Sequence, residues 1–437
     1  MILNRFRIIF VAPYYPPYGA GGAERTTELH ARALVDLGYS VTIVTPNYGN
    51  LIPNDFEDID VIRFSCRGIL KQGQQVSART FYNPLIHNQV VKAIVENINP
   101  NEIYCIHAQH PLLLQGAALA SRKLNVPLIA HIRDTGLICS LGSPCLMEKE
   151  IHKPPSYCSI IKHMECYKNL WAGPYEKRYS KLSKSYGLIR ATIPYFIYLS
   201  RRKYLNQARK IVFASQGLLN LYASVSKLSD RKRLNVVYAI ADKVNEKNIK
   251  EYLVPEKIRN LKKNGSPLIL YVGKVSKGKG VDVLFKAHKK LIKKIPNAQL
   301  VICGNFTKED WNYSHSNTNL LGFVSQEMLA ALYSFCDLVV LPSTWPEPLG
   351  WSTIDAGRYK KPIVATCVGG IPEAIKDGKS GFLVKKLDTD GIAKAISYLI
   401  NNPIEAKNMG LSAHKYIFEK FSKKAVIKQL DNLYNEL

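Results

Sequence analysis

The chain has 437 residues, of which 46% are hydrophobic and 22% are charged. This composition excludes a disordered chain, a fibrous chain and a small disulfide scaffold, and the length predicts two or three domains. Lysine and arginine number 60 against 34 aspartates and glutamates, so the net charge is +26. Such a surface attracts nucleic acid, anionic lipid or phosphorylated small molecules, unless the excess is only a compositional bias.

The cysteine count and the apolar runs bear on the compartment. There are nine cysteines, an odd number. The apolar stretch behind Arg5 and Arg7 ends at Pro13 after about six residues, which is too short for a secretory signal. No run of 18 apolar residues occurs. We therefore expect a cytoplasmic protein with reduced thiols that spans no membrane but can bind peripherally at its inner face.

The first half of the chain alternates short apolar runs with helical patterns. Helices are predicted at 24–37 and 111–123. Strands are predicted at 8–12, 41–45, 102–107, 127–131 and 211–215. Runs that are apolar throughout are typical of parallel strands buried on both faces. The residues from 134 to 207 interrupt this rhythm and are expected to form an insertion.

A polar stretch over 241–265 predicts a domain boundary, because a second alternation of the same kind follows it. Its expected helices are 281–294, 326–335 and 350–360, and its expected strands are 268–272, 299–303, 338–341, 363–366 and 382–384. The sequence therefore predicts an α/β fold with two Rossmann-like, doubly wound domains that face each other across a cleft. The domains would cover 1–240 and 265–415, and a helix over 416–437 would pack back on the first.

Two loops of this pattern contain features that suit phosphate groups. In the first, Gly19, Gly21 and Gly22 lie between a strand and a helix, where amides and the helix N-terminus can approach an anion. The spacing differs from the dinucleotide fingerprint G-x-G-x-x-G, and a plain turn is the alternative. The second loop, 273–280, holds three lysines and three glycines before a helix, which suits a diphosphate, although a solvated charge run is the alternative.

A pair of carboxylates follows the strand at 338–341. Glu347 lies in a proline-rich loop and Asp355 lies in the helix after it, so the two are separated by about 10 Å or less. Carboxylates placed in this way can accept hydrogen bonds from two sets of hydroxyls, such as those of a sugar and a ribose. The amides from Gly350 to Ser352 lie between them and can hold phosphate.

In this order the motifs resemble the retaining glycosyltransferases of family 4, which have the GT-B fold. The resemblance runs from Ile8 to about Leu387. Each motif is weak alone, but their combination and order are specific. They are the glycine-rich loop before Ala23-Glu24-Arg25, Gly273-Lys274 with Lys279-Gly280, Gly322-Phe323-Val324, Pro342-Ser343, Glu347-Pro348-Leu349-Gly350 and Gly369-Gly370-Ile371-Pro372-Glu373.

The resemblance implies a role for each motif. Glu347 would contact the transferred sugar and Asp355 the ribose, while Lys274 and Lys279 would hold the diphosphate. Phe323 and Val324 would flank the base. The loop of Gly19, Gly21 and Gly22 would close over the donor phosphate or the acceptor. Further contacts to the donor would come from Gly273, Leu349, Gly350, Trp351 and Ser352.

Three positions depart from the family's pattern. Asp355 is one methylene shorter than the usual glutamate, and Lys274 replaces an arginine and so loses bidentate geometry. Arg133-Asp134 stands where the family often has His-Asp. His131 lies two positions earlier, and we expect it at the cleft in a catalytic role.

The resemblance implies a retaining hexosyltransferase that uses a UDP- or GDP-linked sugar and a glycan or lipid-linked acceptor, in the assembly of cell-surface polysaccharide. It implies no further cofactor and no metal. One alternative is a nucleotide-sugar epimerase on a similar frame, which lacks the spacing from Glu347 to Asp355. The other is a nucleic-acid-binding protein, which no RRM, KH or zinc-finger signature supports.

Two features of the expected insertion leave alternatives open. Four cysteines could bind zinc or an iron–sulfur cluster, but they lack C-x2-C pairs, and unligated thiols are the alternative. They are Cys139, Cys145, Cys158 and Cys166. The apolar and aromatic run 193–199, followed by Arg201-Arg202-Lys203, predicts either a segment at an anionic membrane surface or a core helix with a basic face.

Overall fold

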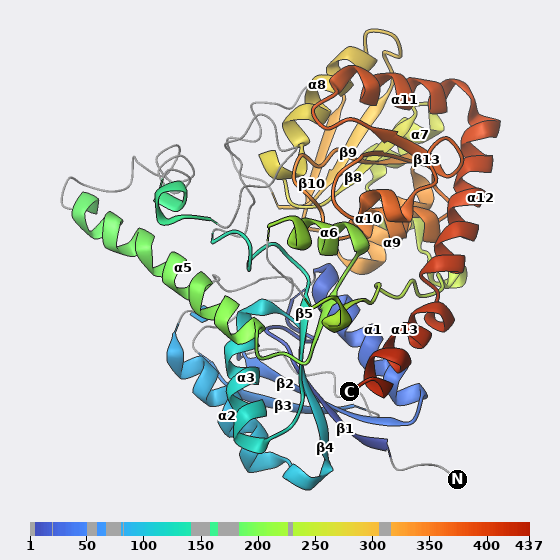
Figure 1. Ribbon diagram of the computed structural model, residues 1–437. Coiled ribbons are helices and arrows are strands. Elements are labelled where there is room, and N and C mark those ends of the chain that lie inside the picture. Colours follow the sequence, from blue (N-terminus) through green and yellow to red (C-terminus); the bar gives the residue numbers. More distant parts are fainter. Residues whose placement is uncertain are drawn as a thin grey trace. The chain divides into compact units, whose positions relative to one another are not determined.

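The computed structural model describes residues 5–19, 21–49, 59–66, 80–81, 83–140, 158–164, 183–225, 230–305 and 316–437. The chain divides into two compact units, one of Met1–Ile240 with Val426–Leu437 and one of Ala241–Ala425. Each unit has one parallel sheet with helices on its faces (Figure 1). The predicted fold class, α/β with two doubly wound sheets, is confirmed. Of the expected insertion, 141–157 and 165–182 lie outside the described residues.

The sheet of the first unit has the order β3-β2-β1-β4-β5-β6-β7. Its strands are β1 (Arg5–Val11), β2 (Tyr39–Asn47), β3 (Asp60–Ser65), β4 (Ile103–Ala108), β5 (Leu128–Ile132), β6 (Lys210–Phe213) and β7 (Leu234–Val236). All pairs are parallel, and in the centre Ile8 is paired with Val41 of β2 and Cys105 of β4. The strand order reverses between β1 and β4, and the loops that follow such a switch point are where ligands bind in doubly wound sheets.

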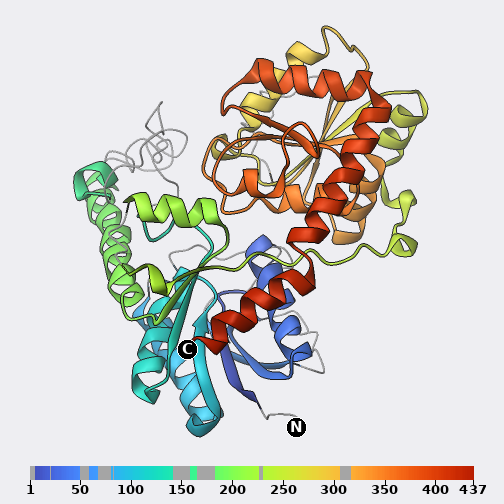
Figure 2. The same cartoon turned by 45° about the vertical axis from the view of Figure 1, so that its right-hand side comes forward.

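Most helices of the first unit bury an apolar stripe on this sheet, although one of them, over 183–205, contacts a neighbouring helix instead. They are α1 (Gly22–Asp36), α2 (Pro84–Asn97), α3 (Leu114–Leu124), α5 (Ser183–Leu205), α6 (Gln216–Val225) and α13 (Lys423–Asn435). The last of these carries the C-terminus and lies along the sheet (Figure 2). Its residues Val426, Leu430 and Leu433 are buried in one core cluster with Ile8 and Phe10 of β1. This burial ties the end of the chain to its first strand.

The sheet of the second unit has the order β10-β9-β8-β11-β12-β13, again all parallel. Its strands are β8 (Leu268–Val272), β9 (Gln299–Cys303), β10 (Thr318–Gly322), β11 (Leu338–Leu341), β12 (Ile363–Thr366) and β13 (Gly381–Val384). Its helices are α7 (Glu256–Lys263), α8 (Val281–Leu291), α9 (Gln326–Phe335), α10 (Trp351–Arg358), α11 (Thr389–Asn401) and α12 (Pro403–Lys420). The order reverses between β8 and β11, so their carboxyl ends form the switch point of this unit.

The apolar runs predicted the central strands of both sheets within a few residues. Three strands, β3, β7 and β10, were not predicted from the sequence. Residues of β3 and β7 are mostly half-buried or exposed, because these strands lie at the two edges of their sheet. Edge strands lack the fully apolar run on which the prediction depended. Among the described helices, none combines the length and hydropathy needed to cross a bilayer.

Candidate functional site

Two loops that leave adjacent strands form the candidate site of the second unit. One runs from Gly273 to Gly280 between β8 and α8, and the other from Pro342 to Gly350 between β11 and α10. Because β8 and β11 are paired, their carboxyl ends bring the loops together. Gly280 has a φ of 70°, and a Cβ there would overlap the carbonyl oxygen of Pro342. Only a glycine therefore permits this close approach.

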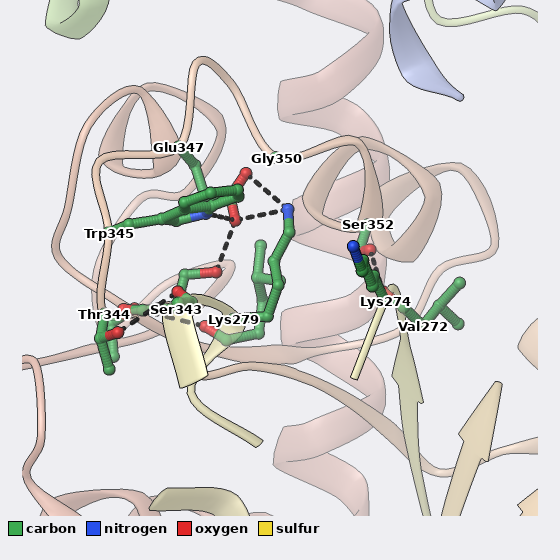
Figure 3. Close-up of polar contacts among 12 residues, drawn as sticks. Val272, Lys274, Lys279, Ser343, Thr344, Trp345, Glu347, Gly350 and Ser352 are labelled. Atoms are coloured by element: carbon green, nitrogen blue, oxygen red, sulfur yellow. Dashed lines mark hydrogen bonds and ion pairs between the residues drawn. The ribbon is translucent and has the colours of Figure 1, made fainter. Parts of the chain in front are cut away.

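The Glu347 carboxylate is the centre of the polar contacts between these loops (Figure 3). Its side chain is only 5% exposed. The Lys279 Nζ donates to both of its oxygens, at 2.7 Å to Oε1 and 2.9 Å to Oε2. Oε1 also accepts from Ser343 Oγ at 2.7 Å and from Trp345 Nε1 at 2.6 Å. The carboxylate is therefore held in one orientation, with a half-buried ammonium beside it.

The backbone of Glu347 is fixed from a third segment. The Gly370 N–H donates to the Glu347 carbonyl oxygen at 2.8 Å. A Cβ on Gly369, whose φ is 56°, would overlap the Glu347 backbone. The two glycines of the 369–373 motif thus allow a close approach that positions the carboxylate.

Lys274 and the start of α10 lie at the same strand end. Lys274 is exposed, and within the described residues no acceptor contacts its ammonium. The Ser352 hydroxyl donates to the Val272 carbonyl at 2.9 Å and ties the first turn of α10 to the end of β8 (Figure 3). Gly350 caps α10 with a φ of 78°. A cation and a helix N-terminus at one place are suited to an anionic ligand.

Asp355 is buried and already paired with a cation. It is 9% exposed, and its Oδ1 accepts from Arg358 NH1 at 2.6 Å. Arg358 also donates to the Asp242 carboxylate at 2.8 Å and to the Asp242 carbonyl at 2.7 Å. Sequence reasoning missed Arg358 and Asp242. The i,i+3 spacing of Asp355 and Arg358 on a helix was a readable signal, whereas the contact to Asp242 was not.

The remaining residues expected to contact a donor differ in exposure. Phe323 and Val324 follow β10; Phe323 is 51% exposed and Val324 is half-buried. Leu349 is buried, and Trp351 is half-buried at the first position of α10. Gly273 directly follows β8. All of these residues lie at the carboxyl ends of strands or in the loops that follow them.

In the first unit, the glycine-rich loop leads from β1 into α1. Gly19 has a φ of 78°, and a Cβ there would lie 2.8 Å from the Glu24 side chain and 3.0 Å from Tyr14. Gly21 caps α1, and Gly22 is its first residue. The loop therefore folds back closely on its own helix, so Gly19 has a packing role whether or not an anion binds.

His131 of β5 lies in the core of the first unit. It is 1% exposed, and its ring is stacked between those of His30, at 5.9 Å between centroids, and His107, at 5.4 Å. Burial, followed by the charge of Arg133, lowers the pKa of His131 well below its ordinary value. The ring is therefore neutral, and both of its faces are covered, so the structure offers no open imidazole at this position.

The neighbouring Arg133 is also buried, at 7% exposure. It donates to Gln109 Oε1 at 2.5 Å and to the Ala23 carbonyl, in the first turn of α1, at 3.0 Å. Burial lowers the pKa of Arg133 to about 9. Asp134 is paired with His110, whose Nε2 lies 3.2 Å from Asp134 Oδ2. Arg133 thus joins the ends of β4 and β5 to the start of α1.

The expected cysteine cluster is only partly described. Cys145 and Cys166 lie outside the described residues. Within the described residues neither Cys139 nor Cys158 forms a disulfide; the first is buried and the second half-buried. Over the part of the chain that the structure describes, no group of three or more metal-ligating side chains is found.

Two families match the two parts of the chain. Residues 20–242 match the family described as Glycosyltransferase Family 4, and residues 254–416 match Glycosyl transferases group 1. Among curated relatives, the alpha-D-kanosaminyltransferase of Streptomyces kanamyceticus is 30% identical over 178 residues, 39% of this chain and 46% of the relative. The capsular polysaccharide biosynthesis glycosyltransferase CapM of Staphylococcus aureus is 28% identical over 178 residues, 39% of this chain and 47% of the relative. The matched part is thus about half the length of these relatives.

The fold as a whole is also that of a solved structure. The HepE protein of Anabaena, in complex with UDP-glucose, aligns with a TM-score of 0.65 at 18% identity over 99% of this chain and 100% of that one. The first family covers half of the chain, its two-sheet fold is present, and the second family follows in the expected order. The chain belongs to glycosyltransferase family 4.

Proposed function

We propose that the protein is a retaining hexosyltransferase that moves a sugar from a UDP- or GDP-linked donor to a glycan or lipid-linked acceptor. The observation that carries the proposal is the pair of Lys279 and Glu347 between two glycine-dependent loops at the switch point of the second unit. The Glu347 carboxylate, which suits sugar hydroxyls, and the lysine ammonium groups, which suit a diphosphate, therefore lie together at the carboxyl ends of two paired strands.

In this proposal the donor binds to the second unit. Glu347 accepts a hydroxyl of the transferred sugar, while Lys274, Lys279 and the amides at the start of α10 hold the diphosphate. Asp355, whose Oδ1 accepts from Arg358, accepts the ribose hydroxyls. Phe323, with its exposed ring, flanks the base.

The first unit supplies the acceptor side in this proposal. Arg133 holds the first turn of α1 and with it the loop of Gly19, Gly21 and Gly22. His131 has no direct contact with substrate here, because its ring is enclosed; it supports Arg133, whose NH2 lies 3.4 Å from its Nδ1.

The chemical step depends on charge that develops on the leaving diphosphate. The bond between the anomeric carbon and the diphosphate oxygen breaks, and the acceptor oxygen forms its bond on the same face, so that the configuration is retained. The acceptor proton passes to the departing diphosphate. Lys274, Lys279 and the helix N-terminus oppose the negative charge that builds up, which is electrostatic preorganisation rather than base catalysis. The residues present thus supply positive charge without a metal.

The comparisons support the donor class and the pathway class. HepE is a protein of the same fold whose structure contains UDP-glucose, and CapM is named for capsular polysaccharide biosynthesis. Both facts concern those proteins, and they favour a nucleotide-sugar donor and a role in surface polysaccharide assembly for this chain.

Thermal unfolding with UDP, GDP, ADP, NAD and a short single-stranded RNA tests the proposal. A ligand at 100 times its dissociation constant adds about 2.7 kcal/mol, which raises the midpoint by several degrees at about 2–4 °C per kcal/mol. We expect a shift with UDP or GDP that is lost in Asp355→Ala, which removes the proposed contact to the ribose. A shift with NAD or RNA alone would contradict the proposal and favour the epimerase or the nucleic-acid-binding reading.

The exposed side chains on one face of α5 are consistent with an acceptor that is linked to a membrane lipid. Ile193, Phe196 and Leu199, each three residues apart and so on one helix face, are 46%, 63% and 39% exposed. Lys203 on the same helix is exposed as well. An apolar stripe with cations, on a chain of net charge +26, is typical of a segment at an anionic membrane surface. We therefore propose that the protein acts as a cytoplasmic, peripheral enzyme at the inner face of the membrane.

A further inference from the structure

Trp345 contacts both charged groups of the candidate site. Its indole Nε1 donates to Glu347 Oε1 at 2.6 Å, and the Lys279 ammonium lies 5.0 Å from the centre of its ring system. The Trp345 N–H donates to the Gly278 carbonyl at 3.2 Å, and a Cβ on Gly278 would lie 3.2 Å from the indole. One side chain thus lies against the lysine loop and holds the carboxylate that follows two residues later (Figure 3).

The contacts of Trp345 make the two oxygens of Glu347 unequal. Oε1 accepts from Lys279, Ser343 and Trp345, whereas among the side chains that the structure describes only Lys279 donates to Oε2. A carboxylate oxygen offers about two lone-pair directions. Oε1 is therefore fully used within the chain, and Oε2 keeps one direction for a further donor such as a hydroxyl.

We propose that Trp345 is a positioning residue that orients Glu347 so that Oε2 faces the sugar of the donor. The inference rests on the proposed function, because it requires a nucleotide sugar at this site. The inference goes beyond that function in two ways. It assigns the orientation of the Glu347 carboxylate to the indole N–H, and it names Oε2 as the oxygen that accepts a hydrogen bond from the sugar. The nucleoside diphosphate part of the donor makes no use of this contact.

The difference between the affinities for the nucleoside diphosphate and for the nucleotide sugar distinguishes a positioning role of Trp345 from a packing role. A tryptophan that only fills space between the loops would affect the nucleoside diphosphate and the nucleotide sugar equally when altered. Trp345→Phe keeps an aromatic ring beside Lys279 and Gly278 but removes the N–H that orients Glu347. Its effect should therefore appear in the sugar-dependent part of the affinity alone.

The experiment compares dissociation constants by calorimetry for UDP with UDP-glucose and for GDP with GDP-mannose. For the base that the wild type binds, we expect Trp345→Phe to raise the ratio of the nucleotide-sugar constant to the diphosphate constant about ten-fold, the usual range for a hydrogen bond to a charged group. Tyr398→Phe is the matched control, because it removes one donor to a glutamate, Glu405, elsewhere in the same unit. Its ratio should equal that of the wild type.

A second variant keeps the inference testable if Trp345→Phe does not fold. Ser343→Ala removes another donor to Oε1 and should raise the same ratio. An unchanged ratio in whichever of the two variants folds and binds the diphosphate would overturn the inference while leaving the proposed function intact. Failure of the wild type to bind any of the four probes would instead count against the proposed function itself.

Discussion

Lys279 and Glu347, 68 residues apart in the chain, meet in an ion pair in which one ammonium contacts both carboxylate oxygens, at 2.7 Å and 2.9 Å. The Glu347 side chain is 5% exposed and that of Lys279 is 24% exposed. Since the carboxylate is buried, removing its cation alone would leave an uncompensated charge and destabilise the second unit, apart from any effect on the proposed chemistry. The two contributions can be separated by substitution.

Replacing Lys279 by methionine should lower both stability and turnover. The free energy of unfolding should fall by about 1–3 kcal/mol, because Glu347 is left buried without its cation. Turnover, followed as release of the nucleoside diphosphate from the donor, should fall more than ten-fold. In the double variant Lys279→Met/Glu347→Gln the unpaired charge is gone, so stability should return while turnover stays low. Near-normal turnover in Lys279→Met would refute the role of this lysine.

The sequence predicted the two strands that precede the loops of this pair, because a short, fully apolar run between turns is typical of a buried strand. It also predicted that Lys274 and Lys279 follow one strand and Glu347 another, and the family resemblance assigned all three to one donor site; the pairing of the two strands comes from the structure. It did not predict that Arg358 also pairs with Asp242, because these two residues are 116 positions apart in the chain. Such pairs arise only from the folded backbone.

His131 shows the other limit of sequence reasoning. A residue in a buried parallel strand points to one face or the other of the sheet, and an apolar run carries no alternation to tell which. The ring of His131 points into the core, where His30 and His107 cover it. The glycine loops were predictable as loops, but the overlap of a Cβ at Gly280 with Pro342 depends on packing between two segments far apart in the sequence.

Arg358 should be one of the most sensitive positions of the second unit. It is 6% exposed and pairs with Asp355 and Asp242, so Arg358→Met leaves two carboxylates without their cation. We expect a loss of about 3–5 kcal/mol in urea unfolding. The matched control is Lys360→Met, which breaks an exposed pair with Glu246 and should change the stability far less. Equal losses would mean that the Arg358 contacts contribute no more than a surface pair.

A pair of glycines tests the close approach of the two site loops. Gly280 and Gly265 have φ values of 70° and 77°, but a Cβ at Gly280 would overlap Pro342, whereas at Gly265 nothing lies within 4 Å. Gly265→Ala should cost about 1 kcal/mol, from the strained φ alone. Gly280→Ala should cost about 1–3 kcal/mol more and weaken UDP or GDP binding, because the loops must separate. Similar stability and binding in both variants would show that the loops tolerate separation.

Membrane binding through α5 can be checked by flotation with vesicles of neutral lipid and of neutral lipid mixed with anionic lipid. We expect the protein to float with the anionic vesicles, and Phe196→Ser to reduce the bound fraction several-fold by removing an exposed aromatic ring. The control is Ile404→Ser on α12, where an isoleucine is 79% exposed. Flotation that is independent of anionic lipid, or equal loss in both variants, would contradict the proposed surface.

The three stacked histidines predict an acid-sensitive first unit. Burial and the charge of Arg133 lower the pKa of His30 to about 3 and those of His107 and His131 well below the ordinary value. The unfolded chain therefore binds protons that the folded chain does not, and the stability due to the neutral rings is complete above about pH 6.5 and lost as the pH falls below it. Each ring contributes up to about 1.4 kcal/mol per pH unit to this slope.

Urea unfolding between pH 7.5 and pH 4.5 measures that slope, and one substitution assigns it. His131→Phe keeps an aromatic ring between His30 and His107 but cannot take up a proton in the unfolded chain. Its slope below pH 6.5 should therefore be smaller than that of the wild type by up to one proton, or about 1.4 kcal/mol per pH unit. If instead the two slopes coincide, His131 is charged in the folded unit, beside the Arg133 guanidinium whose NH2 lies 3.4 Å from its Nδ1, and the neutral stack is refuted.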